Sequence, residues 1–394
     1  MNAQAWKILK PFASLRLTVA LFAMAMVLIF AGTLAQVHQG IWGVMGQYFR
    51  SFVVMIEFQL FVPTEMARLP GRFPFPGGFT VGGLLLVNLV AAHAVRFKFS
   101  RKRFGIILIH VGIILLLVGE LITAIYAHEG NMSIDEGSSS NFTEDIREAE
   151  LAVIDVSNPD HDQVVVIPES MLHRHGEVIA DQRLPFDVRV DEWMDNSRLY
   201  GPATAPPGLK PKATAGFGKQ IVAQLLSQAT GVEGQTVDAP SAYVTLFHQG
   251  TQMGAWLVSL YIDQPQFVSV KGQEYGLVLR FKREYKPYTL HLIDFRHDKF
   301  IGTQKPRNFS SLIQLVDPSR NEDRQVLIYM NHPLRYAGET FYQSAFKQGD
   351  TGTILQVVRN PGWLLPYVSC SLVSVGMLIH FGIHLYGFVR RTRS

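Results

Sequence analysis

Apolar residues in this chain are gathered into four long runs separated by polar stretches. Three of the runs contain no charged residue, and the run at 104–127 contains only Glu120. A helix needs about 20 mostly apolar residues to cross the hydrocarbon core of a bilayer. We therefore predict transmembrane helices at about 17–37, 79–95 and 104–126, and a fourth within 361–394.

Between the third and fourth runs, the pattern changes to short segments in which apolar and polar residues alternate. They are rich in Val, Ile, Leu, Tyr and Thr, and Pro, Gly, Asn or Asp residues separate them. This favours antiparallel strands, so we predict a large sandwich-like β domain of about ten strands at 127–360. The strands are expected at 150–156, 163–167, 186–193, 242–247, 255–262, 275–283, 288–295, 310–316, 325–330 and 353–358. The chain is thus expected to be an α+β integral membrane protein.

Two segments do not follow either pattern. In 38–78, apolar residues recur at helical spacing from Ile41 to Met55, which is typical of a helix lying at the membrane surface. Residues 201–240 interrupt the β pattern with a linker-like stretch rich in Pro, Gly and Ala, within which 219–228 is expected to form a short helix.

Composition agrees with a membrane protein rather than a soluble enzyme. Hydrophobic residues make up 48% of the 394 residues and charged residues only 17%, against about 25% charged in ordinary soluble domains. A compact transporter bundle is also excluded, because the long β region separates the third span from the fourth.

Basic residues predict the orientation of the chain. The first 16 residues, the turn between the second and third spans, and the tail after the fourth contain no acidic residue, and together they hold more positive charge than the net +4 of the whole chain. Lys and Arg in short loops mark the cytoplasmic side. Both termini are therefore expected in the cytoplasm, and 38–78 and 127–360 outside it. The basic residues are Lys7, Lys10, Arg16, Arg96, Lys98, Arg101, Lys102, Arg103, Arg390, Arg391 and Arg393.

This placement removes nucleic acid as an expected partner, because the basic residues lie at the membrane surface. A cleaved signal peptide ending at Ala35 is the alternative interpretation of the first apolar run. The run is longer than the 7–15 apolar residues of a typical signal core, which favours a retained span.

The motifs of common catalytic sites are absent from the sequence. Cys370, inside the fourth run, is the only cysteine, so the chain holds no disulfide, CxxC pair, CxxCH haem attachment site or cysteine-based zinc site. Phosphate-binding glycine loops, the GxSxG elbow and the HExxH helix are absent too. If the protein takes part in disulfide or cytochrome c chemistry, the thiols must therefore belong to a partner.

Histidines within the apolar runs are the strongest candidates for chemistry. Ionisable residues inside a bilayer are rare and suggest a functional site. His110 lies six residues after Phe104, about 9 Å into the third span at 1.5 Å per residue. Three others, also near the cytoplasmic ends of their spans, are His93, His380 and His384.

His110 has the surroundings that suit an axial ligand of a planar apolar cofactor such as haem. At about 100° per residue, the stripe around it is aliphatic, apart from Arg103, which lies about two helical turns before it. Arg103 could contact the haem propionates. The alternative is a histidine hydrogen-bonded to a neighbouring helix. The aliphatic residues are Ile106, Ile107, Ile113, Ile114 and Leu117.

A different face of the third span carries a glycine every seven residues, at Gly105, Gly112 and Gly119. This spacing predicts close packing against another helix.

The remaining candidates have weaker support. His380 and His384 share a helical face but lack a third ligand, and His93 lies almost at the water boundary. They stand as alternative iron ligands, although a structural role is the simpler interpretation. Glu120 could handle protons or pack against a partner. In the β region, His173 and His175 would share one face of a strand, again without a third ligand.

Several segments resemble those of the ResB family of cytochrome c biogenesis proteins, in the same order along nearly the whole chain. The segments that carry the resemblance are ASLRLTVAL (13–21), GTLAQ (32–36), GIILIHVGIILLLVGELI (105–122), EGNMSIDEGSSSN (129–141), KPYTLHLIDF (286–295), PRNFSS (306–311), NHPLRYAGETFYQSAF (331–346) and NPGWLLPYVSC (360–370).

The resemblance implies a function. ResB proteins belong to system II of the bacterial inner membrane. With a CcsA-type partner, they move haem b from the cytoplasmic side outward for attachment to the CxxCH thiols of apocytochrome c. The family's intramembrane haem ligand matches His110, and the second ligand belongs to the partner. The WGxxWxWD-type haem-handling motif of the partner is absent from this chain, which implies the ResB component alone.

Two hypotheses from different classes follow. The first is a non-catalytic haem-handling assembly factor in which His110 supplies one axial bond. The second is a b-type electron carrier that ligates its own haem with His110 and either His380 or His93. The source of the second ligand distinguishes them. The large β domain favours the assembly factor, because electron transfer alone does not need it.

The predicted orientation can be tested with a reporter fused near residue 250. A reporter that works only outside the cytoplasm should be active there, because 127–360 is expected on that side. A cytoplasmic reporter active at the same position would contradict the orientation.

Overall fold

A computed structural model describes residues 9–62, 68–96, 100–159, 161–227, 238–300, 302 and 306–392, which form two compact units. The first unit contains the chain up to His128 and from Arg359 onward. The second contains Glu129–Ala229 and Gly234–Val358. Three of the basic residues that predict the orientation, Lys7, Lys98 and Arg393, lie outside the described residues, as does Gln228 at the end of the helix expected at 219–228.

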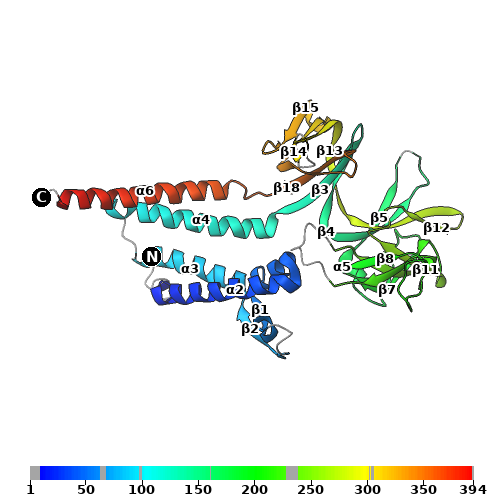
Figure 1. Ribbon diagram of the computed structural model, residues 1–394, viewed down its shortest axis with the longest axis horizontal. Helices are drawn as coiled ribbons and strands as arrows, with labels where there is room; N and C mark the ends of the chain where they lie inside the picture. The colour runs from blue at the N-terminus through cyan, green and yellow to red at the C-terminus, as the bar shows by residue number, and fades with distance from the viewer. Residues whose placement is uncertain are drawn as a thin grey trace. The chain divides into compact units, whose positions relative to one another are not determined.

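The first unit contains four helices long and apolar enough to cross a membrane, as predicted. They are α2 (Leu15–Val44), α3 (Gly78–Arg96), α4 (Phe104–Tyr126) and α6 (Leu365–Thr392). Figure 1 shows α4 alongside α6, and α3 alongside α2. Residues 101–103 form a single 3₁₀ turn that leads into α4.

Helices α4 and α6 approach closely because α4 turns its three glycines towards α6. A Cβ added at Gly105 would lie 2.6 Å from the carbonyl oxygen of Gly376, and one at Gly112 would lie 2.8 Å from that of Ser369. Neither separation leaves room for a side chain. The predicted packing through glycines is therefore confirmed, and α6 is the helix that they contact.

A polar contact joins α3 to the start of α2. The Asn88 side chain is 3% exposed, and its amide oxygen accepts a hydrogen bond from Thr18 Oγ1 at 2.7 Å. Its Nδ2 donates to the carbonyl oxygen of Ser14 at 3.2 Å. An amide among apolar helices is costly unless it is hydrogen-bonded, so this contact fixes the relative register of the two helices.

The prediction of a surface helix within 38–78 is only partly correct. Helix α2 breaks at Gly40 (φ 71°) and returns through a π-helical turn at Met45–Phe49. The chain then forms the hairpin of β1 (Val53–Glu57) and β2 (Arg72–Pro76). A short 3₁₀ turn, Phe58–Phe61, follows β1.

The strand forms because alternate residues of β1, Val54 and Ile56, are buried against α2, and this burial overrides the helical spacing. Met55 points away from that core and is 41% exposed. The prolines of β2, Pro74 and Pro76, also favour extended backbone.

The second unit is an antiparallel β structure, as predicted, built on a ten-stranded sheet. Its path is β15-β14-β13-β4-β3-β18-β17-β16, with β12 paired to β13 and β5 paired to β4. The bounds are β3 (His128–Asp135), β4 (Ser139–Asp155), β5 (Gln163–Pro168), β12 (Gln266–Val270), β13 (Gln273–Lys299), β14 (Pro306–Asp317), β15 (Glu322–Tyr329), β16 (Leu334–Tyr336), β17 (Glu339–Phe346) and β18 (Gly352–Arg359).

Two smaller sheets complete the unit. A four-stranded sheet has the order β11-β10-β7-β6, and β8 pairs with β9. Short turns of helix lie at Glu169–Leu172 (α5), Phe217–Lys219 and Pro318–Arg320. The strands are β6 (Val178–Ile179), β7 (Asp187–Met194), β8 (Ser197–Tyr200), β9 (Val222–Leu225), β10 (Ser241–His248) and β11 (Thr251–Ser259).

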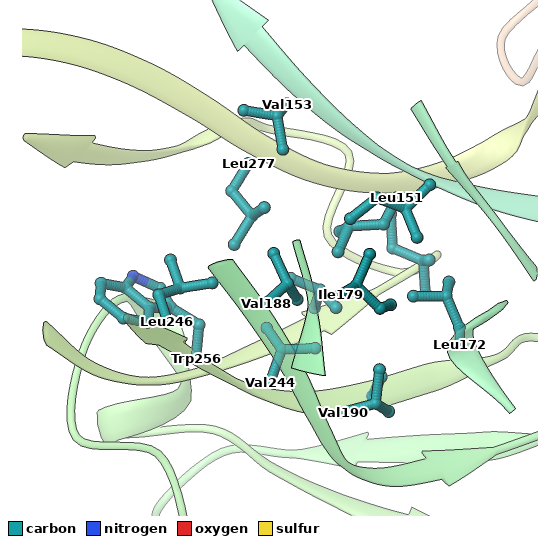
Figure 2. Packing of buried hydrophobic residues seen from close by; sticks show 14 of the residues in the cluster. Leu151, Val153, Leu172, Ile179, Val188, Val190, Val244, Leu246, Trp256 and Leu277 are labelled. Carbon is teal, nitrogen blue, oxygen red and sulfur yellow. The ribbon is translucent and has the colours of Figure 1, made fainter. Parts of the chain in front are cut away.

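Two separate cores stabilise these sheets. The first lies between the four-stranded sheet and the β4, β5, β12 and β13 part of the large sheet. Figure 2 shows Val188 and Val244 of the smaller sheet facing Leu151 and Leu277 of the larger one. The second core joins residues of β3 and β13–β18, among them Leu290, which is fully buried. The predicted sandwich-like packing of two sheets is found at the first core.

Two expected elements differ from the structure. The strands expected at 275–283 and 288–295 are one strand, β13, which continues through Pro287 with irregular register against β4. The helix expected at 219–228 is wrong, because Val222–Leu225 forms strand β9. Val222 and Ala223 are buried there, and the Ala223 amide donates to the Tyr243 hydroxyl at 3.2 Å. Tertiary burial thus outweighs a helix-compatible local composition.

The glycine contact predicts the effect of adding a side chain. Gly112→Val should destabilise the detergent-solubilised chain by about 1–3 kcal/mol, because the new atoms would overlap α6. Thermal unfolding followed by intrinsic fluorescence would measure this. Gly387→Val on α6 is the matched control, since an added Cβ there has no neighbour within 4 Å among the described residues. Equal effects of the two substitutions would contradict the role of the glycine face.

Candidate functional site

His93 of α3 and His110 of α4 face each other across the contact between the two helices. Nδ1 of His110 lies 3.0 Å from Nε2 of His93, and the ring centroids are 4.6 Å apart at 89°. Both side chains are half-buried. The structure therefore shows the alternative stated for His110, a histidine hydrogen-bonded to a neighbouring helix, and it brings His93 rather than His380 to His110.

A backbone carbonyl determines which ring nitrogens carry protons in this pair. His93 Nδ1 lies 2.9 Å from the carbonyl oxygen of Leu89, which can only accept. In the neutral pair, His93 must therefore donate from Nδ1 and accept at Nε2, so His110 donates from its Nδ1. This assignment leaves the lone pair of His110 on Nε2, the nitrogen remote from His93.

The surroundings of His110 are apolar along the helix and basic at its start. The aliphatic residues of its stripe are half-buried, and Arg103 is exposed at the N-cap of α4. Arg101 is exposed in the preceding turn. The stripe consists of Ile106, Ile107, Ile113, Ile114 and Leu117.

The distance between the histidines is that of a hydrogen bond. Two nitrogens bound on opposite sides of one metal ion at about 2 Å each would be about 4 Å apart, with both lone pairs directed at the metal. Here one nitrogen donates to the other at 3.0 Å. In this arrangement His93 orients His110, and the Nε2 lone pair of His110 faces away from His93.

His380 and His384 form a second pair elsewhere, on α6. Their ring centroids are 4.6 Å apart. The backbone of His380 packs against Gly105, on the face of α4 roughly opposite His110 at about 100° per residue. The structure thus does not bring His380 to His110. His384 is exposed.

The other sequence-derived candidates lie apart from this pair. Glu120 is exposed on α4, three turns beyond His110. In the β unit, His173 Nε2 lies 3.2 Å from Glu169, whereas His297 Nδ1 lies 2.8 Å from Asp350. Among the described residues, no three His, Cys, Asp or Glu side chains are grouped as a metal site.

The pairing of His93 with His110 had a signal in the sequence. His93 precedes Arg96 by three residues, and His110 follows Phe104 by six. Two spans joined by a short basic turn run antiparallel, so both histidines were expected near the same ends of neighbouring spans. Which faces meet, however, depends on helix rotation, which one sequence does not give.

Comparison with known proteins relates this chain to a family and to a curated relative. The model of the ResB-like family matches residues 93–192 and 253–354. Protein NrfI of Wolinella succinogenes is 24% identical over 303 residues, which cover 75% of this chain. The chain spans only 29% of the length of NrfI.

The helices and the β unit define an α+β protein with several candidate membrane spans. The chain belongs to the ResB-like family, as the sequence resemblance predicted. Family membership supports its involvement in cytochrome c biogenesis.

The proton assignment in the histidine pair can be measured directly. In ¹⁵N-histidine spectra of the full chain in lipid, His110 should be protonated at Nδ1, because His93 accepts from it. His93→Leu should shift His110 towards the Nε2-protonated form, whereas His380→Leu should leave it unchanged. A His110 that is Nε2-protonated in the unsubstituted chain would contradict the assignment.

Proposed function

We propose that this protein is a haem-handling subunit for cytochrome c biogenesis in the bacterial inner membrane. With a CcsA-type partner, it carries haem b across the membrane towards apocytochrome c. The observation that carries the proposal is the hydrogen-bond chain from Leu89 through His93 to His110, which directs one imidazole lone pair away from the pair.

His110 would bind the haem iron through Nε2. Haem iron accepts axial imidazole, and metal-bound histidines commonly donate their other N–H to an acceptor that fixes the ring and raises its basicity. His93 supplies that acceptor at 3.0 Å. The aliphatic stripe of α4 suits the porphyrin ring, while Arg103 lies at the end of α4 where propionates would meet cations.

The second axial ligand is proposed to come from the partner. His93 is engaged as the acceptor for His110, and His380 packs against another face of α4. With only one ligand from this chain, release of haem from it would require a single iron–imidazole bond to break, as suits a carrier of haem. Synthase activity is assigned to the partner, so this chain is proposed to be non-catalytic.

The proposed orientation puts both termini and the turn between α3 and α4 in the cytoplasm. The histidine pair then lies in the cytoplasmic half of the bilayer, and the β unit lies outside. In this position the β unit would guide apocytochrome c or brace the partner.

A b-type electron carrier remains the second candidate function. It requires two axial ligands from this chain, and the 3.0 Å contact would have to open for His93 and His110 to bind iron from opposite faces. Low-spin bis-histidine haem in the purified single chain would favour this function.

Removing the imidazole of His110 tests the proposal. In cells that contain the partner, His110→Ala should abolish haem retention and cytochrome c maturation, because an iron bond is lost while packing changes little. Added imidazole should partly restore both. Pyridine haemochrome quantification of the purified complex and haem staining of the cytochrome would measure these outcomes.

Matched variants separate the contribution of His110 to haem binding from those of the other histidines. His93→Leu should weaken haem binding about 10–100-fold, as expected for a residue that orients a ligand. His173→Ala and His380→Ala should retain haem. Unchanged haem content and spectrum in His110→Ala would show that His110 is not the ligand.

A further inference from the structure

A cavity of about 680 Å³ lies at the end of α3 and α4 opposite the histidine pair. This volume is in the range of small-molecule sites. The residues that line it come from the turn after α2 and from α3 and α4. They are Met45, Phe49, Arg50, Phe52, Gly78, Phe79, Gly82, Gly83, Leu86, Leu117, Glu120, Leu121, Ala124 and Ile125.

The cavity continues the same seam between α3 and α4 that holds the histidines. At about 100° per residue, Leu117 and Leu121 lie on the stripe of His110, and Leu86 and Gly82 lie on that of His93. Leu117 is about 10 Å and Leu121 about 16 Å along α4 from His110, at 1.5 Å per residue. A molecule leaving His110 along this seam would therefore meet the cavity.

Two glycines keep part of the cavity wall flat. A Cβ added at Gly82 or Gly83 would have no described atom within 4 Å, in contrast to the crowded glycines of α4. Packing within the described chain therefore does not require glycine at these positions. Glycine there instead allows a flat molecule to approach the backbone of α3.

The chemistry of the lining suits a flat apolar molecule with an anionic group. Phe49, Phe52 and Phe79 contribute aromatic rings, which can stack on a planar ligand. Arg50 is the cation of the lining, and its guanidinium can bind a carboxylate through two parallel hydrogen bonds. Glu120 would repel an anion, so the acidic edge of the ligand must face Arg50.

We propose that this cavity is a second tetrapyrrole site, which receives haem after it leaves His110. The proposal rests on the proposed function of the chain and adds a resting place for haem on the side of the membrane where it is to be used. The aromatic side chains would bind the ring and Arg50 a propionate, so the site requires no iron bond.

Metal-free protoporphyrin IX is a suitable probe, because it cannot use His110 as an iron ligand. The full chain in detergent should give an induced circular dichroism band in the Soret region, which partition into micelles does not produce. The band should persist in His110→Ala. Gly82→Leu should reduce the affinity at least tenfold by filling the cavity, and Arg50→Gln should reduce it about tenfold by removing the carboxylate contact.

Two further variants keep the test decisive. Gly387→Leu, which also adds a side chain into open space on a helix, should bind protoporphyrin like the unsubstituted chain. Leu86→Trp fills the cavity from another position and should act like Gly82→Leu even if that variant folds poorly. Thermal unfolding of each variant would establish that it is folded.

Unchanged protoporphyrin binding in both cavity-filling variants would overturn the proposal, and so would displacement of the probe by phospholipid alone. Either result would leave the role of His110 in haem retention intact. Conversely, haem retained by His110→Ala would contradict the proposed function, while the protoporphyrin measurements would still report on the cavity.

Discussion

A polar side chain inside an apolar helix bundle is costly unless it is hydrogen-bonded, because water is not there to solvate it. This constraint acts where α3 meets α2 and where α3 meets α4. Asn88 ties α3 to the start of α2, and His93 uses the Leu89 carbonyl and His110. Each contact is local, yet each fixes the rotation of a helix. The orientation of the candidate iron ligand is therefore a consequence of satisfying polar groups.

Helix α4 has two faces with different roles. Its glycine face lies against α6 so closely that no side chain fits, whereas the opposite face carries His110 towards α3. Tight packing on one side lets the other side remain loosely filled, with the cavity beyond Leu117. The rigid contact supports the helix, and the open seam leaves room for a ligand. A bundle packed tightly on both faces would have no such space.

Much of the fold was predictable, because long uncharged runs and alternating patterns depend on local sequence. The four helices and most strands follow from them. Strand β9 was missed because burial of Ala223 beside Tyr243 is a long-range effect. The continuity of β13 through Pro287 likewise depends on its neighbours in the sheet. For the site, the apolar surroundings of His110 were visible in the sequence. Its contact with His93, however, depends on how α3 and α4 are rotated about their axes, which the sequence does not give.

Strand β13 contributes residues to both cores of the β unit, Leu277 to one and Leu290 to the other. Neither core can lose its packing without exposing part of the same hydrogen-bonded strand. The two halves should therefore exchange their amide hydrogens through a common opening, as one cooperative folding unit rather than two. A partner protein that grips one end of β13 would then slow the fluctuations of the other, and mechanical coupling would extend along the whole unit.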